Sequence, residues 1–106
     1  MNLWTAESVP GDNGPVSYAE FLRSEYLSAG IYRLVAGSSD PQRPHEQDEI
    51  YCVLSGRGRF HVEDEVHDLR PGSILYVPAR ASHRFEGIVE DLTLLVVFAP
   101  PETDID

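Results

Sequence analysis

The stretch that decides the fold runs from Arg43 to Gly56 and reads RPHEQDEIYCVLSG. Its second half, IYCVL, is an unbroken run of apolar, β-branched and aromatic residues, which predicts a buried strand. On an extended chain, side chains two or four residues apart point to the same side. His45, Gln47, Glu49 and Tyr51 are therefore expected to share one face that looks into the interior of the fold.

A third candidate ligand, His83, follows a second unit in which Pro71-Gly72 opens a strand that ends at Pro78. Two imidazoles and one carboxylate, gathered from two strands, can hold Fe, Mn, Ni, Co or Zn and leave open positions for substrate or water. We therefore predict a divalent transition metal bound by His45, Glu49 and His83.

Three further roles follow from the same face. Gln47 adds a carbonyl oxygen to the metal if its side chain faces inward. Glu49 is the candidate for proton transfer, and the phenol of Tyr51 is a candidate for orienting or protonating a substrate. Filling of the core is the alternative reading of Tyr51.

The spacing of these residues resembles the cupin superfamily. The first motif of that family is a glycine, five residues, H-x-H, three or four residues, a glutamate, six residues and a glycine. His45 matches the second histidine of this motif, and Glu49 and Gly56 match its glutamate and final glycine. Arg43 stands where the family has its first histidine. A guanidinium has no lone pair to donate to a metal, so this position cannot supply a fourth ligand.

The second cupin motif is a glycine, five residues, P-x-G, two residues, a histidine, three residues and an asparagine. Gly72, Pro78 and His83 match at these spacings, whereas Arg80 replaces the glycine and Gly87 the asparagine. Each motif alone is weak, but the linked pair is specific. The resemblance implies an all-β fold, a small double-stranded β-helix of the jelly-roll or RmlC-like type.

Strand signals alternate with turn signals from residue 29 to residue 101. The strands are expected near residues 31–35, 49–54, 59–62, 66–69, 73–77, 83–85 and 92–98. We divide the chain into an N-terminal extension packing on the barrel (1–28), the barrel itself (29–101) and an acidic tail (102–106). Within the extension, Ser17–Tyr26 fits either one helical turn or an edge strand.

Composition limits the partners. The 8 basic and 18 acidic residues give a formal charge of -10, which disfavours nucleic acid and anionic membrane surfaces. No signal peptide or membrane-spanning run is indicated, so a cytoplasmic location is expected. The segments Ile74–Val77 and Leu92–Phe98 are apolar on both faces. We expect a second sheet layer to cover one face and another subunit to cover the other, in a homodimer.

Substrate contacts are expected from Arg43, Tyr76 and Phe85. If Arg43 points into the cavity, it suits a carboxylate or enolate. Tyr76 and Phe85 are spaced to line the barrel interior beside the metal, although aromatic core packing is the alternative.

Two functions remain open. The first is a metal-dependent enzyme acting on a small oxygen-bearing substrate, for which the cupin resemblance implies a dioxygenase, isomerase, lyase or cyclase. The second is a non-catalytic module that binds or senses a small molecule in the same cavity. Because of Arg43, a scaffold that has lost its metal is a further alternative.

Overall fold

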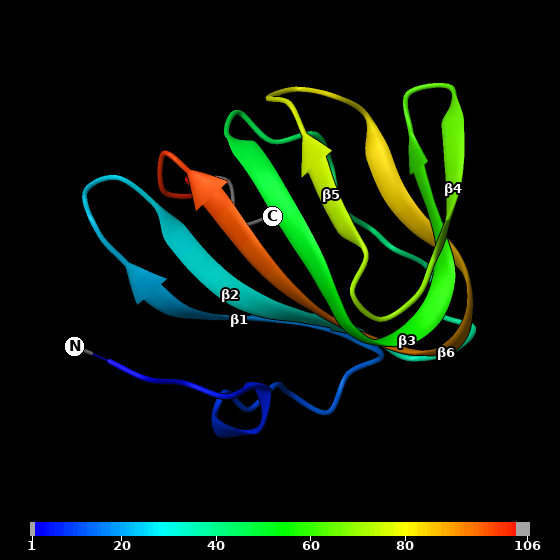
Figure 1. Cartoon of the computed structure of the whole chain (residues 1–106), viewed down its shortest axis with the longest axis horizontal. Helices are drawn as coiled ribbons and strands as arrows, with labels where there is room; N and C mark the ends of the chain where they lie inside the picture. The colour runs from blue at the N-terminus through cyan, green and yellow to red at the C-terminus, as the bar shows by residue number, and fades with distance from the viewer. Residues whose placement is uncertain (1, 104–106) are drawn as a thin grey trace.

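The chain folds as one antiparallel sheet that curls over on itself, as a computed structural model of residues 2–103 shows (Figure 1). The sheet order is β1-β2-β6-β3-β4, and β5 pairs with the first part of β3. The elements are η1 (Ala6–Ser8), β1 (Val16–Arg23), β2 (Ser28–Leu34), β3 (Asp48–Val62), β4 (Glu65–Leu69), β5 (Ile74–Val77) and β6 (His83–Ala99). The expected all-β fold is confirmed. Within the described residues, no helix is long and apolar enough to cross a membrane.

Two long strands, β3 and β6, build most of the barrel. The sequence predicted separate strands at 49–54 and 59–62 and at 83–85 and 92–98, but each of these pairs forms one continuous strand. The register between β3 and β6 shifts at three places between Val53 and Arg59, which bends the pair. Gly56 adopts φ 98°, and a Cβ at this position would overlap the carbonyl of Asp91 on the partner strand. The bend therefore requires glycine there.

The interior of the curled sheet is an apolar and aromatic core. Along the first part of β3, odd-numbered residues are buried and even-numbered ones are more exposed. Tyr51, Phe60 and Phe85 pack against one another with ring centroids 4.8 to 5.8 Å apart. The core consists of Tyr32, Leu34, Tyr51, Val53, Phe60, Leu69, Val77, Ala81, Phe85, Ile88, Leu92, Leu94, Val96 and Phe98.

The segment with two alternative predictions, Ser17–Tyr26, contributes an edge strand. Most of it forms β1, which pairs antiparallel with β2. The N-terminal segment packs beside this edge, where Trp4 lies against Phe21 with ring centroids 4.8 Å apart. Arg33 on β2 also donates to the backbone carbonyls of this segment.

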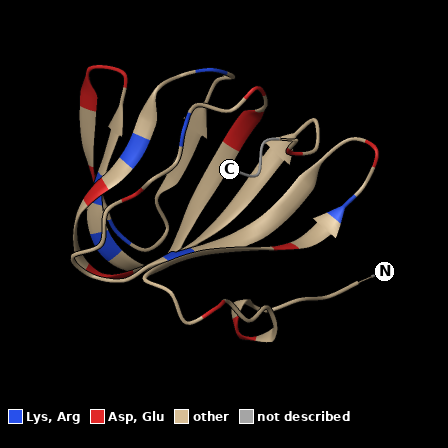
Figure 2. Cartoon of the chain, turned by 180° about the vertical axis from the view of Figure 1, so that it is seen from behind, with Lys and Arg blue, Asp and Glu red and all other residues tan. Residues whose placement is uncertain are grey.

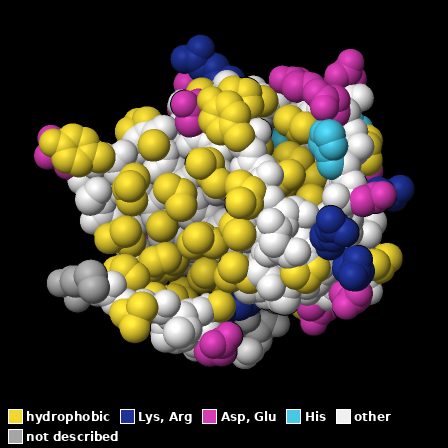
Figure 3. All heavy atoms as spheres, viewed as in Figure 1, with side chains coloured by type: hydrophobic (Ala, Val, Ile, Leu, Met, Phe, Trp, Pro, Cys, Tyr) yellow, Lys and Arg dark blue, Asp and Glu magenta, His cyan; other side chains and the backbone are white. Residues whose placement is uncertain are grey.

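The surface separates into charged and apolar parts. Carboxylates are spread over strands and loops, and the turn between β3 and β4, residues 63–64, is entirely acidic (Figure 2). Hydrophobic side chains gather on the side shown in Figure 3. There β5, β3 and β6 lie side by side and turn apolar residues outward. We call this surface the outer apolar face, formed by Ile50, Cys52, Leu54, Ile74, Tyr76, Leu95 and Val97.

Candidate metal centre

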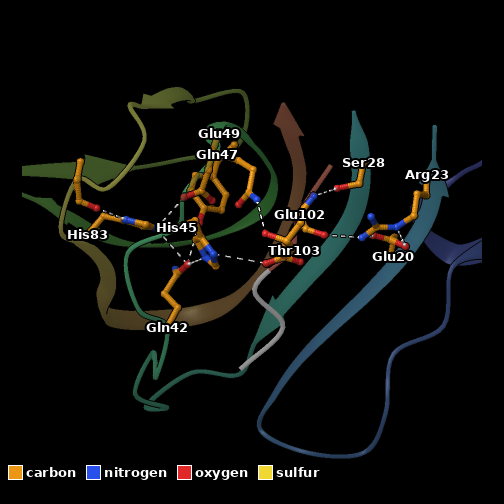
Figure 4. A network of polar contacts seen from close by, with 12 residues as sticks. Glu20, Arg23, Ser28, Gln42, His45, Gln47, Glu49, His83, Glu102 and Thr103 are labelled. Carbon is orange, nitrogen blue, oxygen red and sulfur yellow. Dashed lines mark hydrogen bonds and ion pairs between the residues drawn. The ribbon is translucent and has the colours of Figure 1, made fainter. Parts of the chain in front are cut away.

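The three predicted ligands meet inside the barrel. His45 lies in the loop before β3, Glu49 near the start of β3, and His83 is the first residue of β6. His83 is opposite Val62, at the far end of β3 from Glu49, so the curl of the sheet brings the two side chains together. One donor atom from each of the three residues lies within 4.8 Å of the others, and all three residues are buried. The structure thus assembles the donor set that the spacing predicted (Figure 4).

The tautomer of His83 is fixed by a backbone contact. Its Nδ1 lies 2.9 Å from the carbonyl oxygen of Ala81, and a carbonyl can only accept, so Nδ1 carries a hydrogen. Nε2 is 3.1 Å from Oε1 of Glu49. Burial lowers the pKa of His83, but the hydrogen bond and charge of Glu49 act in the opposite direction, and the net pKa is raised. Glu49 therefore makes the protonated, positively charged form of His83 more favourable than it is in a free imidazole.

Buried polar atoms at this site fit a bound cation. Glu49 is 1 % exposed, and its Oε2 has no hydrogen-bond partner within the described structure. Leaving a buried charged oxygen unpaired is costly, whereas a cation beside it offsets that cost. Two imidazoles and a carboxylate are also ordinary ligands of first-row transition metals. The residues present therefore suit a divalent metal.

Tyr51 is a neighbour of this donor set and is fully buried. Its hydroxyl lies 3.3 Å from Nε2 of His83 and donates to Oε1 of Gln42 over 2.9 Å. Burial and then the charge of Glu49 raise the pKa of Tyr51 well above its usual value. The phenol therefore keeps its proton at neutral pH and can act as a hydrogen-bond donor.

Sequence reasoning missed Gln42, which reaches into the site from the loop between β2 and β3. Its Oε1 is 3.1 Å from Nε2 of His83 and 3.4 Å from Nε2 of His45. Its Nε2 donates to Asp40 over 2.6 Å. Neither Gln42 nor Asp40 occupies a position of the motif pattern, and only the path of the loop brings them here.

The second missed residue is Glu102, from the predicted acidic tail. Its Oε2 is 3.5 Å from Nδ1 of His45, and both side chains are buried. Its backbone N–H donates to Ser28, and its carbonyl accepts from Arg23. These contacts hold the end of the chain across the barrel beside His45. The remaining tail residues, 104–106, lie outside the described residues.

A cavity of about 510 Å³ leads to the centre. Gln42, His45 and Tyr51 form part of its wall, whereas Glu49 and His83 lie deeper, with side chains that are 1 % and 0 % exposed. The cavity wall also carries two further phenols, two carboxylates and a guanidinium, from Tyr18, Tyr32, Glu20, Glu102 and Arg23. Of the three proposed ligands, His45 is the one that lies on the cavity wall.

None of the three predicted substrate residues lines this cavity. Tyr76 is 61 % exposed on the outer apolar face, so the expectation that it lines the interior is wrong. Its neighbour Val77 is the residue of β5 that points inward, and alternation then turns Tyr76 outward. Phe85 lies inside the barrel, where it packs on Tyr51. Arg43 is exposed and is not on the cavity wall, and its contact with a substrate stays a prediction.

Gln47 faces inward, as the alternation predicted. It is 3 % exposed, and its Nε2 donates to the hydroxyl of Thr103 over 2.9 Å. Its Oε1 is buried and lacks a hydrogen-bond partner within the described structure. Its role as a metal ligand stays a prediction.

Comparison with known protein families settles the family. The model of the cupin domain matches residues 30–98, which is most of the chain. The chain is a cupin. Its fold was predicted from the paired motifs, and this match confirms the resemblance.

Relatives of this cupin include the uncharacterized protein SCO3923 of Streptomyces coelicolor, 49% identical over 87 residues that cover 82% of this chain and 83% of the relative. An acireductone dioxygenase of Leishmania major is 35% identical over 65 residues, 56% of this chain but only 19% of the relative. Among solved structures, KdgF from Halomonas sp. matches with a TM-score of 0.84 at 18% identity and covers 100% of this chain and 99% of its own. At that identity the match speaks for the fold alone.

This cupin departs from the family motif where Arg43 replaces the first histidine. Arg43 is an exposed residue and does not line the cavity that leads to the centre. The preceding residue, Gln42, places an amide oxygen beside both histidines instead.

Proposed function

We propose that this cupin binds one divalent transition metal through His45, Glu49 and His83 and acts as a metal-dependent enzyme on a small oxygen-bearing molecule. The observation that carries the proposal is the buried donor set, in which Oε2 of Glu49 has no hydrogen-bond partner within the described structure. A charged oxygen that is unpaired and 1 % exposed is stabilised by a cation and destabilises the fold without one.

The residues of the chain have separate roles in this proposal. A bound metal would supply Lewis-acid polarisation of a substrate oxygen. Oε1 of Glu49 lies beside Nε2 of His83. If Glu49 holds the ion through one of its two oxygens, the other oxygen is left to accept a proton. Tyr51 keeps its proton and donates a hydrogen bond toward the cavity side of the centre.

The wall of the cavity suits a substrate with several oxygens. The hydroxyl of Tyr32 donates to Asp40 over 2.6 Å, so its oxygen can still accept a hydrogen bond from a substrate hydroxyl. Tyr18 and Glu102 add a phenol and a carboxylate. The reaction class is to be sought among dioxygenases, isomerases, lyases and cyclases, and one relative bears the name acireductone dioxygenase.

The alternative is a module that binds a small molecule without converting it. The feature that favours it is the depth of the centre, because Glu49 and His83 are not on the cavity wall and Gln42 lies in front of them. A ligand held by the outer phenols alone would then not reach these two side chains. The same protein incubated with a bound ligand would give no product under this alternative.

The test is elemental analysis of protein purified without added metal or chelator, beside the His45→Ala and His83→Ala variants. We expect about one transition-metal ion per chain in the unmodified protein and much less in both variants. Activity screening with the ion that is found then separates the enzyme from the binding module. Absence of metal in the unmodified protein, with none taken up from Fe, Mn, Ni, Co or Zn, would contradict the proposal.

We also propose that the chain forms a homodimer through the outer apolar face. On this face Ile74 is 72 % exposed and Tyr76 61 %, and Ile50 pairs with Tyr76 across β3 and β5. A continuous exposed apolar surface of this kind favours association with another protein surface. A second copy offers the same surface, as a twofold interface requires.

A further inference from the structure

The side chain of Gln42 has an orientation that the rest of the loop fixes. Its Nε2 donates to Oδ2 of Asp40 over 2.6 Å. Asp40 is itself held in place, because it accepts hydrogen bonds from the hydroxyl of Tyr32 over 2.6 Å and from the backbone N–H of Phe85 over 2.8 Å. A carboxylate only accepts, so the amide nitrogen of Gln42 must face Asp40. The amide oxygen must then face the histidines (Figure 4).

That oxygen accepts a hydrogen bond from the hydroxyl of Tyr51 over 2.9 Å, and a carbonyl oxygen has a second lone pair to be satisfied. Because Nδ1 of His83 is engaged by the carbonyl of Ala81, a neutral His83 presents the lone pair of Nε2 toward the centre. This nitrogen is 3.1 Å from Oε1 of Gln42 and 3.1 Å from Oε1 of Glu49. A proton on Nε2 of His83 would satisfy both oxygens, and so would a metal ion that Nε2 binds in its neutral form.

The separations also match the spacing of ligands around one ion. With bonds of about 2.1 Å, neighbouring ligand atoms lie roughly 3.0 Å apart in an octahedral site and roughly 3.4 Å apart in a tetrahedral one. Oε1 of Gln42 is 3.1 Å from the ring nitrogen of His83 and 3.4 Å from that of His45. The amide oxygen is therefore spaced from both histidines as a further ligand would be.

We propose that Oε1 of Gln42 is the fourth protein ligand of the metal. This inference rests on the proposed function and adds to it a ligand from outside the histidine and glutamate positions of the motifs. A neutral amide oxygen replaces the imidazole that Arg43 cannot supply, so the centre has two nitrogen and two oxygen donors. Asp40 acts as a positioning residue, since it holds the amide with its oxygen toward the ion.

The test uses chelator-treated full-length protein titrated with Co²⁺, followed by calorimetry and by the visible absorption of the ion, which depends on its coordination. We expect Gln42→Leu to weaken Co²⁺ binding by about tenfold or more and to change the absorption spectrum. If Gln42→Leu does not fold, Gln42→Asn withdraws the same oxygen and is expected to show the same loss.

The control is Glu46→Gln, which changes an exposed carboxylate of the same loop and is expected to bind Co²⁺ as the unmodified protein does. Equal affinity and an equal spectrum for Gln42→Leu and the unmodified protein would overturn the inference and leave the three-residue site intact. A loss seen only in Gln47→Leu would overturn it as well and assign the fourth ligand to Gln47. If the unmodified protein binds no metal, the proposed function fails and this inference fails with it.

Discussion

Metal binding should raise the thermal stability of this cupin strongly, and His83→Gln should remove the effect. The donor atoms of His45, Glu49 and His83 already lie within 4.8 Å of one another in the folded chain. Unfolding separates them, because Glu49 and His83 belong to distant parts of the sequence. The ion therefore binds the folded state and not the unfolded one.

The size of the effect follows from this linkage. A ligand at a free concentration 1,000 times its Kd stabilises the folded state by about 4.1 kcal/mol. In a domain of this size, each kcal/mol raises Tm by roughly 4–8 °C. The expected rise is then roughly 15–30 °C, measured by differential scanning calorimetry of chelator-treated protein with and without the ion that elemental analysis identifies.

The variant needs its own baseline. His83→Gln deprives the Ala81 carbonyl and Glu49 of a buried partner, which costs about 1–3 kcal/mol even without metal. Only the metal-induced shift within each protein is compared, and for the variant we expect a shift near zero. An equal shift in both proteins would refute the reasoning, because the ion would then be bound elsewhere. The absence of a shift in the unmodified protein would refute it too.

Three further predictions concern the surroundings of the centre. Glu102→Ala removes the carboxylate beside Nδ1 of His45 and should weaken metal affinity about 10–100-fold in a calorimetric titration. An unchanged affinity would mean that this contact does not orient the ring. Tyr51→Phe removes the buried hydroxyl that donates to Oε1 of Gln42 and should lower the free energy of unfolding, measured in urea, by about 1–2 kcal/mol. An unchanged midpoint of urea unfolding would contradict a stabilising role of that hydrogen bond. Ile74→Arg places a charge on the outer apolar face and should convert a dimer into a monomer in light scattering. A monomeric unmodified protein would contradict the dimer proposal.

The sequence predicted those parts of the centre that depend on spacing along strands. His45, Gln47, Glu49 and Tyr51 alternate on β3 and the loop before it, and all four are buried. His83 was placed by the second motif. Strand periodicity and turn chemistry act locally, which is why they can be read from the sequence.

Other features depend on contacts between distant segments. Gln42 and Glu102 lie in irregular segments, and their positions follow from hydrogen bonds to Asp40 and Ser28 that no local pattern encodes. Polar and glycine residues at 55–57 and 86–91 suggested loops, but the strands continue through them because bulges absorb the bend. Tyr76 was misplaced because a shift of one residue in a short strand reverses the side on which every residue lies.

The central claim is tested most directly by anomalous diffraction from crystals of the protein grown with Mn²⁺ or Co²⁺, recorded at the absorption edge of the ion. We predict one strong anomalous peak per chain, within bonding distance of His45, Glu49 and His83. Oε1 of Gln42 would lie beside the same peak if it is the fourth ligand. A peak only at surface carboxylates, with His83 still paired to Glu49 and no density between them, would contradict the account.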